Sequence, residues 1–130
     1  MDENTLTIRR ERTERANRFL ATVASTGRGF FHYANGEVSR FEVDGEGHLW
    51  FVDGYRGARI WTHVHGWWGN RFTNGGTMQQ LCLYLKEFVM TGKQIPPVLG
   101  PWDFCDNNLW GYGDEMELVR QTARELGLLV

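Results

Sequence analysis

Seven residues, Arg59 to His65, place a cation, an indole and two imidazoles in the run RIWTHVH. In an extended strand alternate side chains share a face, so Arg59, Trp61 and His63 are expected to lie together. Flat rings beside guanidinium groups stack on nucleobases and bind phosphate, and the same residue types dominate protein interfaces. With the neighbouring strands added, the candidate binding surface is Arg40, Trp50, Arg59, Trp61 and His63. The alternative is a sheet covered on both faces, in which these aromatics are core.

A second group of cations, which includes Arg9 and Arg12, crowds the N-terminal segment, while acidic residues concentrate near the C-terminus. Such an asymmetry suits a polar interface, so Arg9 and Arg12 are further candidate partner-binding residues. The stripe of Ile8, Arg9 and Arg12 is expected to overhang the core, where it could dock on a second copy as a homodimer. The simpler alternative is a solvated helix face with Glu11 and Glu14 paired along it.

Metal and nucleophile chemistry have weaker support. His63 and His65 share one side of a strand, a spacing found in metal sites, but the sequence does not fix a third ligand from His32, His48 or a cysteine. Cys82 lies beside an apolar helical stripe, and Cys105 is flanked by acidic residues that disfavour a thiolate. We therefore predict no metal, no cofactor and no catalytic residues.

The Gly75-Gly76-Thr77 turn precedes a helix, where free N–H groups and the helix dipole favour an anion. It lacks the lysine and the glycine spacing of a P-loop. Ordinary N-capping explains the same residues.

Length and composition limit the classes of protein. With 130 residues, 42% hydrophobic and 23% charged, one globular domain over residues 1–130 is expected. A net charge of −2 excludes the strongly basic footprint of a nonspecific nucleic-acid binder. Two cysteines without CxxC spacing, no signal peptide and no long apolar run favour a cytoplasmic protein without membrane contact.

Periodicity predicts the elements that must position these side chains. Helices are expected over about 7–26, 78–91 and 115–126, the last two opened by capping boxes at Thr77 and Asp114. Short β-branched and aromatic runs over about 30–72, separated by Asn-Gly and Asp-Gly turns, predict a four-stranded antiparallel meander with Val64 in its core face. The Pro/Trp-rich loop 93–113 is expected to pack against the core. The prediction is an α+β fold of order α-β-β-β-β-α-α, with helices mainly on one face of the sheet.

The stretch FEVDGEGHLWFVDGYRGARIWTHVHGWWGNRFTNGGT, followed by TGKQIPP, LGPW and LWGYGDEME, resembles small uncharacterised proteins of phages, prophages and plasmids of Gram-negative bacteria. The shared pattern is GxRIWTH…GGT…LGPW…WGYG, over nearly the whole chain. The resemblance implies a setting on a mobile element, where short accessory proteins often block a host immune component.

The leading hypothesis is a non-catalytic accessory protein that binds and blocks a host target in the bacterial cytoplasm. A counter-defence factor such as an anti-CRISPR protein, acting on a host protein or ribonucleoprotein effector, is one form of it. The alternatives are a small-ligand or nucleotide binder for an immune signal, and direct binding to DNA or RNA. Calorimetry with cyclic oligonucleotides discriminates the first alternative, and a steep salt dependence of affinity the second.

Overall fold

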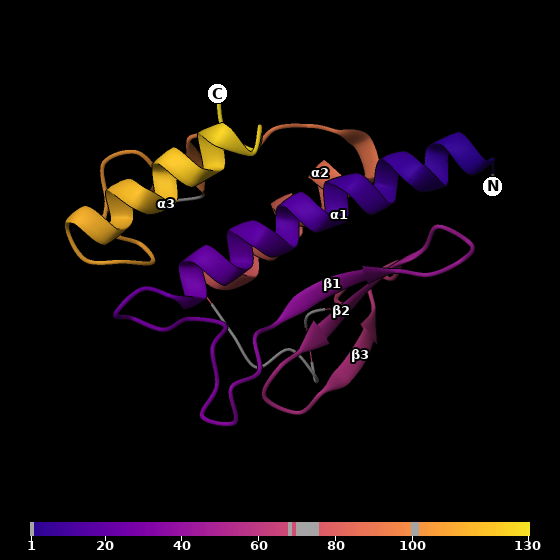
Figure 1. The fold of residues 1–130 in the computed structure, drawn as a ribbon, viewed down its shortest axis with the longest axis horizontal. Helices are drawn as coiled ribbons and strands as arrows, with labels where there is room; N and C mark the ends of the chain where they lie inside the picture. The colour runs from indigo at the N-terminus through magenta and orange to yellow at the C-terminus, as the bar shows by residue number, and fades with distance from the viewer. Residues whose placement is uncertain (1, 68, 70–75, 100–101) are drawn as a thin grey trace.

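The computed structural model describes residues 2–67, 69, 76–99 and 102–130. Its elements are, in chain order, α1 (Glu3–Ala24), β1 (Arg40–Val43), β2 (Leu49–Asp53), β3 (Ala58–Trp61), α2 (Thr77–Thr91), β4 (Val98–Leu99), β5 (Trp102–Asp103) and α3 (Asp114–Glu125). Figure 1 shows all three helices on one side of the sheet that β1, β2 and β3 form. Helix α1 contacts β1, α2 and α3, and is therefore the central element of the fold.

Helix α1 begins earlier than its apolar stripe predicts. The carboxylate of Asp2 accepts a hydrogen bond from the Thr5 N–H at 2.8 Å and caps the helix. The helix therefore begins at Glu3, four residues before the predicted start at about residue 7. The buried face comprises Ala16, Phe19, Leu20 and Val23, as the spacing predicts. The cap thus extends the helix by turns that bury little apolar surface.

The fold is α+β, as predicted, but the main sheet has three strands in the order β1-β2-β3 instead of four. At the start of the predicted 30–72 meander, where its first strand would lie, the chain contributes one isolated bridge between His32 and Val38. Phe31 adopts a left-handed backbone with φ 67°, which bends the chain where a strand would need extended residues. A four-stranded meander is therefore not formed by the described residues.

The two faces of the sheet differ in burial. Antiparallel register aligns Phe41 with Phe51 and Phe51 with Ile60, and all three side chains pack into the core below α1. Val64, predicted to join this face, is 55% exposed because β3 ends at Trp61. The opposite face carries Arg40, Glu42, Trp50, Arg59 and Trp61, whose side chains are half-buried or exposed.

One edge of the sheet is closed by a side chain of α1. The Asn17 amide group donates to the Phe41 carbonyl at 2.8 Å and accepts from the Phe41 N–H at 2.7 Å. It thereby satisfies both main-chain groups that Phe41 directs away from β2, as a neighbouring strand would do. Helix α1 and β1 are joined by this contact as well as by apolar packing.

Neither of the two predicted capping boxes forms. Thr77 and Asp114 are the first residues of α2 and α3, and the cap positions are Gly76 and Gly113, with φ 60° and φ 50° and no side-chain cap. Both helices still cover their predicted ranges to within a residue or two.

The loop over 93–113 contains the short antiparallel pair β4–β5 and packs against the core as predicted. The ring centroid of Phe104 lies 6.2 Å from that of Phe19 and 4.9 Å from that of Trp110, and all three rings are fully buried. This segment is therefore part of the hydrophobic core that α1 and α3 share.

Candidate functional site

The open face of the sheet holds a regular array of side chains. Register places Arg40, Val52 and Arg59 side by side, then Glu42, Trp50 and Trp61. Asp44, His48 and His63 form the next row. The Asp44 N–H donates to the His48 carbonyl at 3.0 Å, and the ring centroids of His48 and His63 are 5.3 Å apart. We call the exposed and half-buried members of this array the open face: Arg40, Glu42, Asp44, His48, Trp50, Arg59, Trp61 and His63.

The predicted members of the candidate surface, Arg40, Trp50, Arg59, Trp61 and His63, therefore lie together on one face. The alternative, a sheet covered on both faces, does not describe this arrangement, since Arg59 is exposed and Trp50 and Trp61 are half-buried. Trp50 and Trp61 form a cross-strand pair with centroids 5.0 Å apart and planes at 70°. Such edge-to-face pairs add stability beyond their buried area.

The cations of the open face already have partners within it. The Arg59 guanidinium lies 4.3 Å from the centroid of the Trp50 ring, and its Nε donates to Glu42 at 3.1 Å. Arg40 donates to the other oxygen of Glu42 at 3.2 Å. One carboxylate thus links two guanidinium groups, so this end of the face carries a single net positive charge.

The opposite end of the open face centres on Asp44, His48 and His63. Asp44 accepts from the Trp50 indole N–H at 3.0 Å, and this bond is the main reason that the pKa of Asp44 lies below its usual value. The His48 ring is 4.9 Å from the Trp61 ring. The Asp44 carboxylate therefore fixes the rotamer of Trp50, and the His48 ring packs against Trp61 and restricts its rotamer.

His63 ends the ladder between β2 and β3 in an unusual way. In a regular ladder the Thr62 carbonyl would accept the Leu49 N–H. Here the Nε2 of His63 accepts that N–H at 2.8 Å, and the Thr62 carbonyl accepts from the Lys86 ammonium. Because a main-chain N–H can only donate, His63 must be neutral with its proton on Nδ1. Burial, followed by the charges of Lys86, His48 and Arg9, lowers the pKa of His63, against a smaller opposite effect of Asp44.

This contact predicts a loss of stability in mild acid. Below the ordinary His pKa of 6.5 the unfolded chain takes up a proton at His63 that the folded chain still excludes, so the free energy of unfolding falls with pH until the lowered folded pKa is reached. Above that window the contribution is complete. Urea unfolding from about pH 8 to about pH 5 measures it, and His63→Gln, which keeps an acceptor, should flatten the decline. Equal pH slopes for wild type and variant would contradict this role.

Arg9 and Arg12 do not lie with the other candidates on the open face. Arg9 donates to the Gly47 carbonyl at 3.0 Å, in the turn at the margin of the sheet, and Arg12 donates to the Val89 carbonyl at 3.4 Å near the end of α2. Arg15 likewise binds the Leu126 carbonyl at the end of α3, at 2.9 Å. These arginines satisfy carbonyls that a helix or turn leaves open, so their first role is structural.

The remaining chemical candidates are separated in the structure. Cys82 is fully buried, and burial raises the pKa of its thiol. Among the described residues, no three His, Cys, Asp or Glu side chains converge as a metal ion would require. The described helices include none with the length and apolarity of a membrane span.

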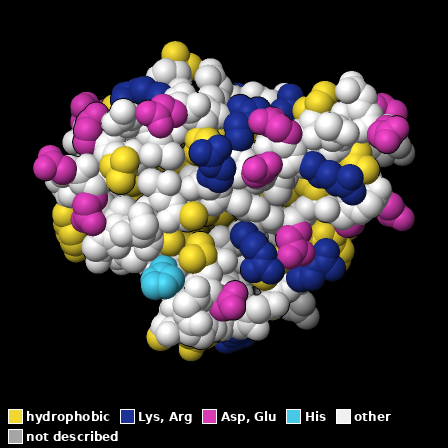
Figure 2. Space-filling model, in the orientation of Figure 1, with side chains coloured by type: hydrophobic (Ala, Val, Ile, Leu, Met, Phe, Trp, Pro, Cys, Tyr) yellow, Lys and Arg dark blue, Asp and Glu magenta, His cyan; other side chains and the backbone are white. Residues whose placement is uncertain are grey.

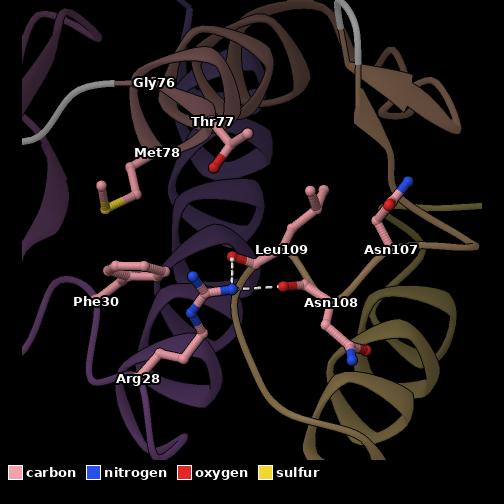
Figure 3. A pocket seen from close by; sticks show the side chains of 8 residues that line it. All are labelled: Arg28, Phe30, Gly76, Thr77, Met78, Asn107, Asn108 and Leu109. Carbon is pink, nitrogen blue, oxygen red and sulfur yellow. Dashed lines mark hydrogen bonds between the residues drawn. The ribbon is translucent and has the colours of Figure 1, made fainter.

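A cavity of about 290 Å³ lies at the start of α2 and includes Gly76 and Thr77 of the predicted anion site, whereas Gly75 lies outside the described residues. Figure 3 shows the Arg28 side chain pointing from below toward the carbonyls of Asn108 and Leu109, and Arg28 donates to both. It also lies over the Phe30 and Tyr112 rings, at 5.1 and 5.2 Å. Arg28 thus ties the loop before α3 to the end of α1.

Charge is mixed on the face of the molecule that Figure 2 shows. Figure 2 shows Lys and Arg side chains interspersed with Asp and Glu over the face in view, without a broad region of one sign. This pattern agrees with the net charge of −2. It differs from the continuous basic surface with which proteins track a phosphate backbone.

A family model, described as YoqU, matches residues 7–130. The chain belongs to the YoqU family. It is 27% identical over 121 residues to the "SPbeta prophage-derived uncharacterized protein YoqU" of Bacillus subtilis (strain 168), an alignment that covers 87% of this chain and 79% of that protein. No solved structure matches. The likeness to a prophage protein supports the mobile-element setting, whereas the Gram-negative host range and the GxRIWTH…WGYG pattern stay predictions.

Three residues that organise the open face were not among the predicted members of the candidate surface: Glu42, Asp44 and His48. Alternation along β1 places Glu42 and Asp44 on the same side as Arg40, so the signal was present. His48 directly precedes β2 and lies two residues before Trp50, so the same alternation places it on the side of Trp50. The role of Lys86, which comes from α2, had no signal in the pattern of the strands.

Proposed function

We propose that this YoqU-family protein is a non-catalytic accessory protein of a prophage that binds a host protein through the open face. The observation that carries the proposal is the centre of that face, where the Arg59 guanidinium stacks on Trp50 and Trp50 pairs edge-to-face with Trp61, both rings half-buried, on the face of the sheet opposite the core. Trp and Arg held in fixed rotamers are the residue types that contribute most to protein interfaces. The setting on a mobile element makes a host defence component, such as a CRISPR effector, the first partner to test.

A protein partner is favoured over a nucleotide by two contacts. A stacked base needs an uncovered ring, but the Arg59 guanidinium occupies the face of Trp50. A phosphate needs unpaired cations, but Arg40 and Arg59 both bind Glu42. Alternating charges around an aromatic centre instead match the polar rim and apolar core of a protein interface.

The test is capture from host lysate with a matched pair of charge reversals. Arg59→Glu removes the stack on Trp50 and places a second carboxylate beside Glu42, whereas Arg18→Glu makes the same charge change on an exposed turn of α1. We expect a protein that wild type and Arg18→Glu retain in stoichiometric amount and that Arg59→Glu loses, with affinity lower by at least about tenfold in calorimetry. Equal retention by both variants, or retention of nucleic acid in place of protein, would refute the proposal.

A further inference from the structure

The two edges of the main sheet are treated differently by the fold. Phe41 on the β1 edge has both its main-chain groups bound by Asn17. The edge at β3 has no neighbouring strand among the described residues. An uncovered strand edge presents main-chain donors and acceptors in the geometry that another strand needs.

The register identifies which main-chain groups β3 presents. The main-chain N–H and C=O groups of Phe41 point away from β2, and Phe41 is aligned with Phe51. Because the direction of these groups alternates along each strand, those of Phe51 point toward β3 and bond Ile60. The Thr62 N–H, which donates to the Leu49 carbonyl, follows the same alternation. The N–H and C=O groups of Arg59 and Trp61 therefore point away from β2, along the outer edge.

We propose that this edge pairs antiparallel with the β3 edge of a second copy, which joins the two sheets into one. A two-fold axis at Arg59, Ile60 or Trp61 would let outward-facing residues meet, and we place it beside Ile60, at the middle of the edge. Arg59 then lies opposite Trp61 of the second copy, and Trp61 opposite its Arg59. Each of these pairs exchanges both main-chain hydrogen bonds.

The side chains at this edge are complementary in the same register. Directly opposed residues have their side chains on the same face at contact distance, so each Trp61 indole meets an Arg59 guanidinium of the other copy. The Arg59 guanidinium already contacts an indole, that of Trp50, within one chain. In the proposed dimer the Arg59 guanidinium lies between the Trp50 indole of its own chain and the Trp61 indole of the second copy, an arrangement that cation–π attraction favours.

The pairing also changes the size of the binding surface. A three-stranded face with strands of four or five residues is small beside the roughly 800 Å² that each partner contributes to a stable protein complex. A two-fold perpendicular to the sheet keeps both open faces on one side and the helices on the other. The dimer itself is independent of the proposed function, whereas the use of the joined face for binding rests on it.

Sedimentation velocity of the purified protein alone, from low micromolar to submillimolar concentration, tests the pairing. We expect a concentration-dependent dimer. Arg59→Pro removes the outward N–H, which the monomer's own ladder does not use, while Arg59→Ala removes only the side chain. The proline variant should associate at least about tenfold more weakly than the alanine variant. A wild type that stays monomeric throughout, or equal association of the two variants, overturns the proposal.

Amide hydrogen exchange of the wild type gives a second measurement that needs no variant to fold. The amides of Arg59 and Trp61 should exchange more slowly as concentration rises, while that of Phe41, bound by Asn17, stays constant. Concentration-independent exchange at Arg59 and Trp61 in a sample that contains dimer would show another interface and overturn the proposal. Because neither experiment contains a host protein, a failed lysate capture leaves these results unaffected.

Discussion

Phe104→Ala is expected to lower the free energy of unfolding by about 3–5 kcal/mol, the range for truncating a fully buried aromatic ring. Phe104 comes from the Pro/Trp-rich segment, and its ring packs edge-on against Phe19 of α1 and against Trp110. Removing it leaves a cavity between α1 and the segment that precedes α3. Urea denaturation followed by far-UV circular dichroism measures the loss.

Val98→Ala is the matched control, because Val98 lies in the same segment but is 51% exposed. Its truncation should change the free energy of unfolding by no more than about 0.5 kcal/mol. If both substitutions had similarly small effects, residues 93–113 would be a surface loop and not part of the core.

Asn17→Ala is expected to cost about 2–4 kcal/mol, since it leaves both the N–H and the carbonyl of Phe41 without a partner beside the core. The side-chain amide of Asn17 both donates and accepts here, which alanine cannot do. The expected effect is large for a polar side chain of a helix. Thermal unfolding and amide exchange at Phe41 both report it.

Thr22→Ala on the same helix serves as the comparison, since its hydroxyl donates to the Arg18 carbonyl of the preceding turn, a contact within the helix itself. We expect a change below about 0.5 kcal/mol. A stability loss at Asn17 no larger than that at Thr22 would mean that the β1 edge is held by apolar packing alone.

The parts of the fold that follow from short-range pattern were predictable. The stripe of Phe19, Leu20 and Val23 fixes the buried face of α1, and strand alternation alone places Arg40, Trp50, Arg59 and Trp61 on one face. The ends of elements were harder, because they depend on single contacts. Asp2 extends α1, and the positive φ of Phe31 removes a strand that β-propensity favours.

The long-range polar contacts were not predictable from spacing. Nothing in the order of residues indicates that Asn17 binds Phe41 or that Lys86 takes the Thr62 carbonyl and so leaves the Leu49 N–H to His63. The N-terminal arginines illustrate the same limit. Their density indicated an interface, yet Arg12 and Arg15 bind carbonyls at the ends of α2 and α3, a role that only the packed helices define.

Hydroxyl-radical footprinting of the complex with the captured host protein tests the central claim, that the open face is the binding surface. Oxidation of Trp50, Trp61 and His48 should fall when the partner is bound. Tyr112, which is 61% exposed beside α3, is the internal reference and should oxidise at the same rate in both samples. Protection of Tyr112, with Trp50 and Trp61 unchanged, would place the interface on α3 and contradict the claim.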